Sequence, residues 1–491
     1  MEGNLGRKLF TGTLWTVAAR FGIRGLSVIN TIILARLLTP ADFGIVAMAS
    51  IVTTLMAACT ETGLNQVIIY YRNTDKSFYD TAWTIQMIRG FVLGIVLILF
   101  SRFIANFFDE PKLTHVLLFL SVVFILNGLI SANIVTFQKE MRFDKEFYYR
   151  ISTNGMNFVG TILLALWLRN YWAMVFGNII FAISCVVFSF LYAPGFPKPT
   201  LHHWRKIFNF SQWIFLRETS IFIGQKLDQI IVGRWFGKAL LGQYDMATQI
   251  ATLPSTEMSM PLSRSLFPAL AKMQDDHKQF CFTLSMSISV ILLIVLPTCC
   301  GLIMIAHPTV MLLLPRNWDH VGALIQILSV YGLFRVIYTP CSSAMTAKGK
   351  VRVVFFINIF DITLKCICLY LGYIYGGIIG IAWATVISTC IVALLYLVCV
   401  RYNNYMDFTI LLKQMWRPII ASIIMILSVH GIQHIVTVMT FGLLIEVVVM
   451  VTTGIFTYGL IIFGLWWITG KPNDSVEAKL FNISVSLFKK A

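Results

Sequence analysis

The stretch "LARLLTPADFGIVAMA", residues 34–49, decides how the rest of the chain is read, because a related stretch follows 198 residues later. That second copy is "VGRWFGKALLGQYDMA", residues 232–247. With this offset, residues 30–49 show seven identities in twenty with residues 228–247. The chain therefore contains an internal repeat, or two similar helix hairpins that pack alike for stability. Within the quoted stretches the matched pairs are Arg36 and Arg234, Ala41 and Ala239, Gly44 and Gly242, Met48 and Met246, and Ala49 and Ala247.

The composition indicates a membrane protein. Of 491 residues, 58% are hydrophobic and only 12% are charged, and the mean hydropathy is +0.79. A chain this apolar cannot cover a soluble domain of its size with polar side chains. A helix that crosses a bilayer needs about 20 mostly apolar residues. Fourteen segments qualify: 10–37, 42–69, 80–104, 113–137, 147–168, 172–193, 207–236, 241–269, 281–306, 321–346, 353–372, 376–400, 415–435 and 441–468.

The predicted fold class is an all-α polytopic membrane protein with two six-helix lobes. Both copies of the repeat begin on the same side of the membrane, which indicates parallel halves related by an axis along the membrane normal. We predict an N-lobe over residues 1–195 and a C-lobe over 196–402, with two further helices and a tail over 403–491. A central cavity between the lobes follows from that arrangement.

Lysine and arginine predict the orientation. One side of the predicted topology, which holds both termini, carries 23 of these residues, whereas the other side carries seven. By the positive-inside rule both termini are cytoplasmic, and the net charge of +16 mostly reflects this bias. We therefore do not expect nucleic acid as a partner; the basic connections are expected to contact anionic membrane lipids.

Several segments resemble one known family. They are "FQKEMRFDKE" at 137–146, "SLFPALAKMQDD" at 265–276, "LPRNWDHVGALIQILSVYGLFR" at 314–335 and "SSAMTAKGKVR" at 342–352, together with the opening stretch. Over nearly the whole chain the sequence resembles the Wzx-type bacterial oligosaccharide flippases of the colanic acid type. That family lies within the larger group of MATE exporters and lipid II flippases. The resemblance implies the bacterial inner membrane and translocation of an undecaprenyl-pyrophosphate-linked oligosaccharide to the periplasmic leaflet. It also implies other polysaccharide-assembly proteins as partners.

Ionisable residues inside the spans are the candidate site, because a lone charge facing lipid costs at least about 2 kcal/mol. On the first span Arg20, Arg24, Ser27 and Thr31 fall within about 60° of one another at 100° per residue. Arginine suits a pyrophosphate, since its planar fork donates two hydrogen bonds and stays charged. The alternative is that Arg24 pairs with Glu61 only to neutralise charge. The predicted substrate-binding set is Arg20, Arg24, Arg89, Arg217 and Arg335.

Acidic residues inside the spans are candidates for coupling or for charge pairing. Glu61, Asp228 and Glu257 are the candidates for exchanging H+ or Na+ with the cavity. A low-dielectric cavity raises the pKa of a carboxyl group in general, so that its charge can change as the cavity opens to either side. Asp361 and Lys365 are four residues apart, which favours an internal structural pair. No cofactor or metal is expected beyond such coupling ions.

Three prolines seven residues apart, Pro254, Pro261 and Pro268, lie on nearly one face of a predicted span. Proline removes a helical hydrogen bond and bends the helix, so this span is predicted to act as a gating element, although fixed kinks are common too. The segment "PGFPKP" at 194–199 is predicted to be a semi-rigid linker between the lobes.

The sequence gives no indication of an enzyme. It has no Asp-x-Asp pair, no glycine-rich phosphate loop ending in Lys-Ser or Lys-Thr, and no long external insertion. Its ten cysteines lie mostly in apolar spans without a histidine cluster, which favours packing over metal binding. A transporter driven by an ion gradient or by its substrate's gradient fits best. The alternative is an ion-coupled multidrug exporter of the same architecture.

Overall fold

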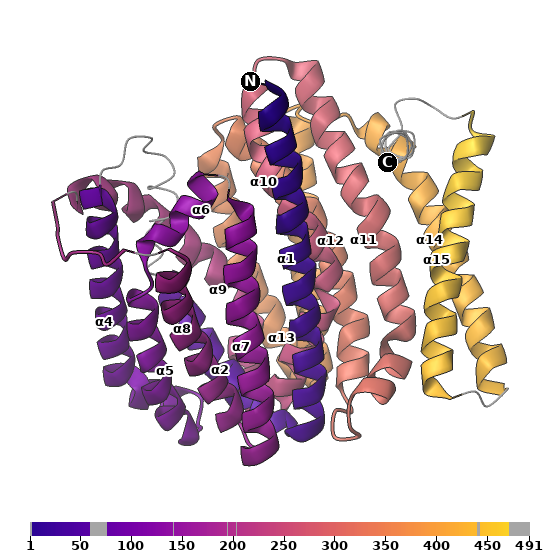
Figure 1. Ribbon diagram of the computed structural model, residues 1–491. Coiled ribbons are helices and arrows are strands. Elements are labelled where there is room, and N and C mark those ends of the chain that lie inside the picture. The colour runs from indigo at the N-terminus through magenta and orange to yellow at the C-terminus, as the bar shows by residue number, and fades with distance from the viewer. Residues whose placement is uncertain are drawn as a thin grey trace. The chain divides into compact units, whose positions relative to one another are not determined.

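The computed structural model is built from helices and their connections (Figure 1). It describes residues 2–58, 76–140, 142–193, 195–202, 204–438 and 442–470, without the side chains of 2–14, 205–221, 258–265, 408 and 436–438. The elements are α1 (Glu2–Leu37), α2 (Pro40–Ala58), α4 (Lys76–Phe107), α5 (Lys112–Gly128), η1 (Ala132–Ile134), α6 (Val135–Lys139), α7 (Phe143–Leu168), α8 (Trp172–Tyr192), α9 (Trp204–Ala251), α10 (Leu253–Lys272), α11 (His277–Leu313), α12 (Val321–Ala347), α13 (Val351–Tyr402), α14 (Phe408–Val438) and α15 (Leu443–Ile468).

The all-helical, multi-pass membrane prediction is confirmed. In the described residues ten helices are long and apolar enough to cross a membrane, or eleven if one bent pair is counted as a single span. The predicted number of fourteen is not confirmed by this count. Two long helices contain a break: Gly237 in α9 has φ 76°, and Gly377 in α13 has φ 55°. Both are left-handed conformations that favour glycine, and the break in α13 lies beside the predicted boundary between 353–372 and 376–400.

The prediction of one helix over 113–137 is wrong. α5 ends at Gly128, and the short helices η1 and α6 follow at an angle of 60°. The open carbonyls at this end are occupied, because Gln86 Nε2 donates to Asn127 O at 2.8 Å and Trp83 Nε1 donates to Leu129 O at 3.3 Å. Ser131 then caps η1 by accepting from Asn133 N at 3.3 Å. Side chains of the neighbouring α4 thus stabilise an early end to the helix.

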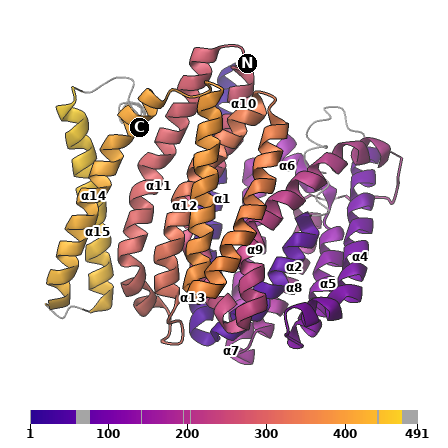
Figure 2. The same cartoon turned by 180° about the vertical axis from the view of Figure 1, so that it is seen from behind.

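The chain divides into two compact units, Met1–Gln243 and Tyr244–Ala491, called unit 1 and unit 2 here. The predicted division into 1–195, 196–402 and 403–491 follows the sequence repeat instead, and it stays a prediction. In unit 1, α4 packs on α5, α5 on α8, α8 on α7 and α7 on α1 (Figures 1 and 2). The segment after α8 is fastened to this unit by Thr200, whose backbone N–H donates to Thr84 Oγ1 at 2.9 Å.

The first copy of the repeat forms the tight turn from α1 into α2. Asp42 Oδ2 accepts from the backbone N–H of Thr39 at 3.0 Å and from its hydroxyl at 2.6 Å, while Asp42 N donates to Thr39 Oγ1 at 3.3 Å. This is a capping box, with Pro40 in the first helical position where its missing N–H costs nothing. The other carboxylate oxygen of Asp42 accepts from Tyr171 N at 3.2 Å, so one side chain caps α2 and the start of α8.

The two copies of the repeat meet inside unit 1. A β-carbon on Gly44 would overlap the backbone carbonyl of Lys238, and a β-carbon on Gly242 would overlap the backbone carbonyl of Pro40. Because Gly44 corresponds to Gly242 and Pro40 to Lys238 at the 198-residue offset, the same contact occurs twice with the roles exchanged. Only glycine at both positions allows the backbones this close. The two copies of the repeat therefore contact each other in the folded unit.

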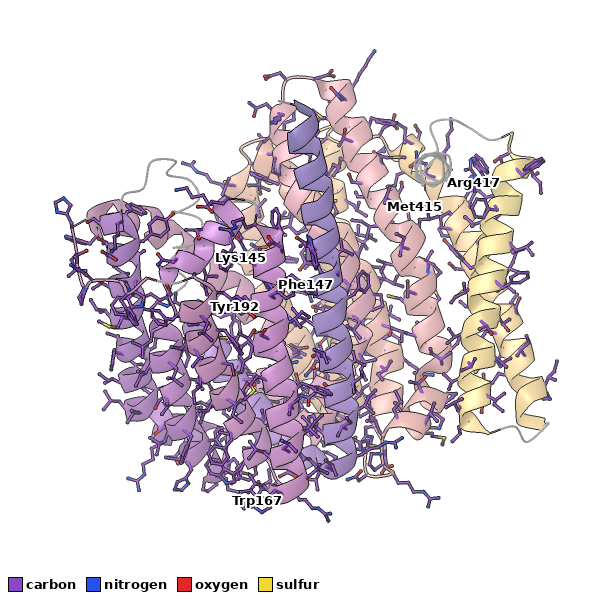
Figure 3. The ribbon with its side chains drawn as sticks, in the orientation of Figure 1. Lys145, Phe147, Trp167, Tyr192, Met415 and Arg417 are labelled. Carbon is purple, nitrogen blue, oxygen red and sulfur yellow. The ribbon has the colours of Figure 1, made fainter. Side chains whose placement is uncertain are left out.

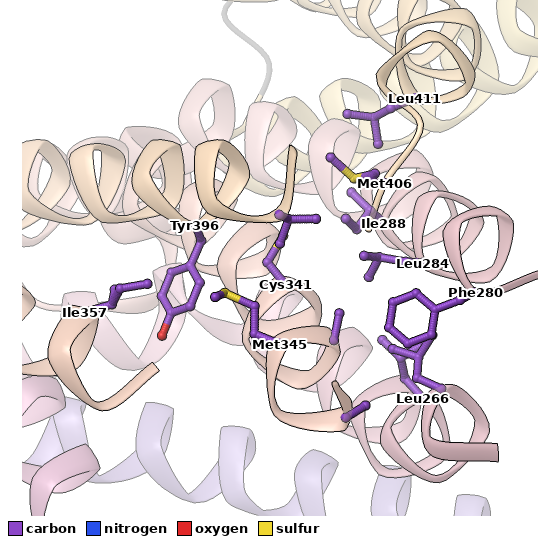
Figure 4. Close-up of a cluster of buried hydrophobic side chains, with 14 of the residues drawn as sticks. Leu266, Phe280, Leu284, Ile288, Cys341, Met345, Ile357, Tyr396, Met406 and Leu411 are labelled. Atoms are coloured by element: carbon purple, nitrogen blue, oxygen red, sulfur yellow. The ribbon is translucent and has the colours of Figure 1, made fainter. Parts of the chain in front are cut away.

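Unit 2 is held by an apolar cluster that draws on five helices (Figure 4). Phe280 and Leu284 of α11 are fully buried in it, with Leu266 of α10, Met345 of α12 and Tyr396 of α13. The connection before α14 adds Met406. Burial of this apolar surface fixes how α10 to α14 pack on one another.

One lysine joins the connections at an end of unit 2. Lys348, which follows α12, has its ammonium 4.5 Å from the ring centre of Phe280 and 5.6 Å from that of Tyr405, and it donates to the carbonyl of Gln274. Its charge therefore holds together the ends of α10, α11 and α13. A cation over two aromatic rings with a further hydrogen bond is a stabilising contact.

We predict that Lys348→Gln lowers the free energy of unfolding by roughly 1–3 kcal/mol, because the cation–π contacts and one hydrogen bond are lost. Thermal unfolding of the purified protein in detergent measures this. Lys350→Gln, at an exposed position two residues on, is the matched control and should leave the midpoint unchanged. Equal midpoints for the two variants would contradict the assigned role of Lys348.

Candidate functional site

Arg20, Arg24, Ser27 and Thr31 form a polar stripe along α1, and this stripe points in a defined direction within unit 1. α1 packs on α7 through Trp15, whose ring centre lies 4.9 Å from that of Phe147, and through Gly22 against Ile151 (Figure 3). At 100° per residue, Arg20, Arg24 and Ser27 lie on the opposite face of the helix. The stripe is therefore turned away from α7.

The side chains of the stripe are not evenly exposed. Arg20 and Arg24 are half-buried, and Nε of Arg24 is fully enclosed by protein. Ser27 is exposed, and Thr31 donates its hydroxyl to Ser27 O at 2.9 Å. The neighbouring face carries Phe21, which is 70% exposed, as a side chain that faces lipid would be. Two half-buried guanidinium groups thus lie about one turn apart on the same face of α1.

Arg89 belongs to another part of unit 1. It is half-buried on α4, a helix that packs closely on α5 through Gly90 and Gly94. α4 lies at the edge of the unit, and α7 and α8 stand between it and α1 (Figures 1 and 2). The structure thus brings Arg20 and Arg24 onto one face and places Arg89 on a helix apart from them.

The acidic candidates are only partly within the described residues. Asp228 of α9 is 4% exposed, beside Gln229 at 2%, and Lys226 Nζ donates to Gln229 Oε1 at 2.6 Å. Glu61 and the side chain of Arg217 lie outside the described residues, so a pairing of Arg24 with Glu61 or of Arg217 with Asp228 stays a prediction. Glu257 is half-buried on α10 in unit 2.

Arg335 in unit 2 is the centre of a cluster of tyrosines. Its guanidinium forms side-chain hydrogen bonds with Tyr331 and Tyr338, one turn before and one turn after it on α12. Tyr338 stacks on Tyr396 with ring centres 5.9 Å apart and planes at 20°, and Tyr396 donates to Asn358 Oδ1 at 3.3 Å. The spacing on α12 was visible in the sequence, whereas the partners from α13 were not.

Two basic residues are buried more deeply than most. Lys365 of α13 is 3% exposed and acts electrostatically on Asp361 one turn earlier, as expected for an internal pair. Arg417 is 6% exposed on α14, with its guanidinium carbon 5.6 Å from the ring centre of Trp416 (Figure 3). Arg417 is one of the 23 lysines and arginines that the predicted topology places on the side of both termini, so its burial is a difference that the helix packing imposes.

The prolines fall at and after the junction of α9 and α10. The two helices are separated at Thr252, two residues before Pro254, which has no N–H to donate to the carbonyl of Ile250. Thr252 N still donates to Thr248 O, and Thr256 N to Thr252 O, both at 3.0 Å, so helical hydrogen bonding continues on both sides. Pro268 lies further along α10, and the side chain of Pro261 lies outside the described residues. A gating role for the three stays a prediction.

Metal binding finds no support in the described part of the chain. There, no group of three or more histidine, cysteine, aspartate or glutamate side chains could hold a metal ion.

A comparison with protein families identifies the family to which the chain belongs. A family described as "Polysaccharide biosynthesis protein" matches residues 33–323. The chain is 23% identical over 430 residues to the lipopolysaccharide biosynthesis protein WzxC of Escherichia coli (strain K12), covering 86% of each. It is 24% identical over 428 residues to the succinoglycan biosynthesis transport protein ExoT of Rhizobium meliloti (strain 1021), covering 85% of each.

Solved structures of other proteins share the fold, and two of them are described here. The lipid II flippase MurJ in an inward closed conformation superposes with a TM-score of 0.74 at 16% identity, covering 93% of this chain and 99% of that one. An inward-facing multidrug resistance MATE transporter of the MOP superfamily superposes with a TM-score of 0.64 at 13% identity, covering 77% of this chain and 94% of that one. At these identities the likeness concerns the fold.

The direction of the α1 stripe predicts its access to water. A thiol reacts as its thiolate, which forms in water and not in lipid. Cysteine introduced at Ser27 should therefore react with a charged, membrane-impermeant thiol reagent at least about tenfold faster than cysteine introduced at Phe21. Wild-type protein in the same vesicles gives the background from the native cysteines. Equal rates at the two positions would show that the stripe does not face an aqueous route.

Proposed function

The chain belongs to the family of polysaccharide biosynthesis proteins, and on this premise we propose that it is a flippase for a lipid-linked oligosaccharide. Its substrate is an undecaprenyl-pyrophosphate-linked oligosaccharide repeat unit, moved from the cytoplasmic to the periplasmic leaflet of the bacterial inner membrane for polysaccharide biosynthesis. The names of the relatives, a lipopolysaccharide biosynthesis protein and a succinoglycan transport protein, support this class of substrate. So does the fold shared with a lipid II flippase.

The structural observation that carries the proposal is the pair of half-buried arginines on α1. A pyrophosphate brings two or more negative charges into the membrane, and the substrate crosses only if those charges are met by fixed cations. Arg20 and Arg24 supply two guanidinium groups about one helical turn apart, and each can hold two phosphate oxygens. Arg89, Arg217 and Arg335 are assigned to the wider cationic lining of a central cavity.

Movement of the substrate is proposed to follow alternating access. The cavity opens first to the cytoplasmic leaflet and then to the periplasmic side, with Glu61, Asp228 and Glu257 assigned to H+ or Na+ coupling or to charge pairing. Pro254, Pro261 and Pro268 are assigned a gating role, in which α10 bends as the cavity changes the side to which it opens. Both termini are placed in the cytoplasm by the distribution of lysine and arginine. Other polysaccharide-assembly proteins are the proposed partners.

The second candidate is an ion-coupled multidrug exporter, which the fold shared with a MATE transporter favours. If the chain exported drugs that are organic cations, the positive charges of Arg20 and Arg24 on α1 would repel them. A fluorescent organic cation offered to proteoliposomes separates the two. Accumulation of the cation without movement of a lipid-linked sugar would support the exporter.

We predict that Arg24→Gln lowers the initial rate of translocation about 10- to 100-fold. A hydrogen bond to a charged group contributes about 1.5–3 kcal/mol, and 1.4 kcal/mol corresponds to a factor of ten. The measurement is movement of undecaprenyl-pyrophosphate carrying a fluorescent sugar in proteoliposomes. Arg24→Lys keeps the charge without the planar fork and should fall between wild type and Arg24→Gln.

The matched control is Arg102→Gln, the same change at an exposed arginine near the end of α4. It should translocate as wild type does. Lys365→Gln tests a charge assigned to structure, and it should lower the unfolding midpoint with a smaller effect on the rate of the folded fraction. Normal translocation by Arg24→Gln would place the pyrophosphate site elsewhere.

A further inference from the structure

The connection between α8 and α9, residues 195–202, is fastened along one edge to α4. The backbone N–H of Thr200 donates to Thr84 Oγ1 at 2.9 Å, and the hydroxyl oxygens of Thr200 and Thr81 lie 3.2 Å apart. Because the Thr84 hydroxyl donates its own proton to Asp80 O at 2.7 Å, its oxygen is oriented to accept from Thr200. Thr81 and Thr84 are buried, so this edge of the connection is part of the packed unit 1.

The other edge of the connection presents an ordered aromatic ring. Phe196 is 82% exposed, yet its ring is held by stacking on Phe190 in the last turn of α8, with ring centres 5.4 Å apart and planes at 20°. A single exposed apolar residue is ordinary on a protein surface, so the surroundings of Phe196 decide what it contacts.

Phe196 continues an apolar stripe of α8. Ile183, Val187 and Leu191 follow one another at intervals of four residues, so they lie on one face of the helix, and all three are exposed. Since α8 is long and apolar enough to cross a membrane, an exposed apolar face of this kind meets acyl chains. The ring of Phe196, stacked beside the end of this stripe on Phe190, extends the lipid-facing surface past the end of the helix.

The rest of the connection has the composition of a membrane–water boundary. Leu201 and Trp204, where α9 begins, are also exposed, and tryptophan is enriched at the level of lipid headgroups. Lys198 is exposed, and Arg205 and Lys206 follow in the sequence. Cations beside apolar rings match the anionic headgroups and upper acyl chains of a bilayer, where each part has a favourable partner.

We propose that residues 195–202, together with Trp204, form an interfacial membrane anchor. Thr200 ties one edge of it to α4. Phe196 on the other edge enters the boundary between headgroups and acyl chains, in the leaflet that the lysine and arginine distribution predicts to be cytoplasmic, and Lys198 meets anionic headgroups. The partner is the lipid surface itself and not the cargo, so this inference does not depend on the proposed function.

Photocross-linking in native membranes tests the lipid contact. The photoreactive residue p-benzoylphenylalanine replaces Phe196, and mass spectrometry identifies what it captures. We expect a phospholipid adduct in a yield similar to that from the same replacement of Leu191, the lipid-facing reference. The yield should exceed at least about tenfold that from the same replacement of Asp275, an exposed residue of the turn between α10 and α11.

Two results would overturn the anchor. One is a yield at position 196 as low as that at Asp275, with a strong adduct at Leu191, because Phe196 would then lie in water. The other is capture of a protein at position 196 in place of phospholipid, because the surface would then be a protein-binding site.

The mass of the adduct also reports on Lys198. In protein with the photoreactive residue at position 196, Lys198→Gln should lower the share of anionic phospholipid among the adducts at least about twofold, since one basic residue near the surface contributes about 1 kcal/mol. Lys278→Gln, the same change at an exposed lysine at the start of α11, should leave the share unchanged. An unchanged share in Lys198→Gln would contradict the contact with anionic headgroups.

Hydrogen exchange tests the fastened edge. Thr84→Val removes the acceptor of the Thr200 N–H, so exchange of the Thr200 amide should become at least about fivefold faster in the folded protein in lipid nanodiscs. Thr363→Val is the matched control, because Thr363 is exposed on α13 and donates only within its own helix, to Ile359 O at 2.9 Å. Equal exchange at Thr200 in wild type and Thr84→Val would overturn the attachment to α4.

Discussion

The close approach of two backbones at Gly44 and Gly242 is the constraint on which the arrangement of unit 1 depends. It brings the α1–α2 turn against the break in α9, although the two lie 198 residues apart in the chain. Gly44 packs on the carbonyl of Lys238, which lies four residues before Gly242. Gly242 packs in turn on the carbonyl of Pro40, which lies four residues before Gly44. A pair of contacts related in this way indicates local two-fold symmetry, and any side chain at either position would remove it.

Around that contact, the capping of the helices does much of the positioning. Asp42 completes the capping box of α2 and accepts a hydrogen bond from the backbone N–H of Tyr171, the residue just before α8, so the turn is joined to the rest of the unit. Gln86 and Trp83 occupy the carbonyls at the end of α5 and allow the chain to turn by 60° there. In a membrane, where an unsatisfied backbone group is costly, such side chains decide where a helix can stop.

Charged residues inside the apolar helices occur in two environments: buried between packed helices, or on a helix face that is turned away from its packing partner. Lys365 and Arg417 are buried within unit 2, where aromatic rings or a carboxylate one turn away surround them. Arg335 is similarly held by tyrosines. Arg20 and Arg24 differ because they form a stripe that faces away from the helix on which α1 packs. That contrast, rather than the number of basic residues, distinguishes a candidate route for an anionic substrate from charges that stabilise packing.

The sequence by itself determined the membrane class, the helical fold, the family and the polar stripe on α1. Hydropathy, helical periodicity and short motifs are local properties, so they can be read without knowing which helices touch. Its repeat also pointed to Gly44 and Gly242 as equivalent positions. The tertiary structure alone decided that these glycines meet each other, that α4 with Arg89 stands apart from α1, that Tyr396 reaches the Arg335 cluster, and that Arg417 is buried. These depend on contacts between residues far apart in the chain, and such contacts are set by how complete helices pack against one another.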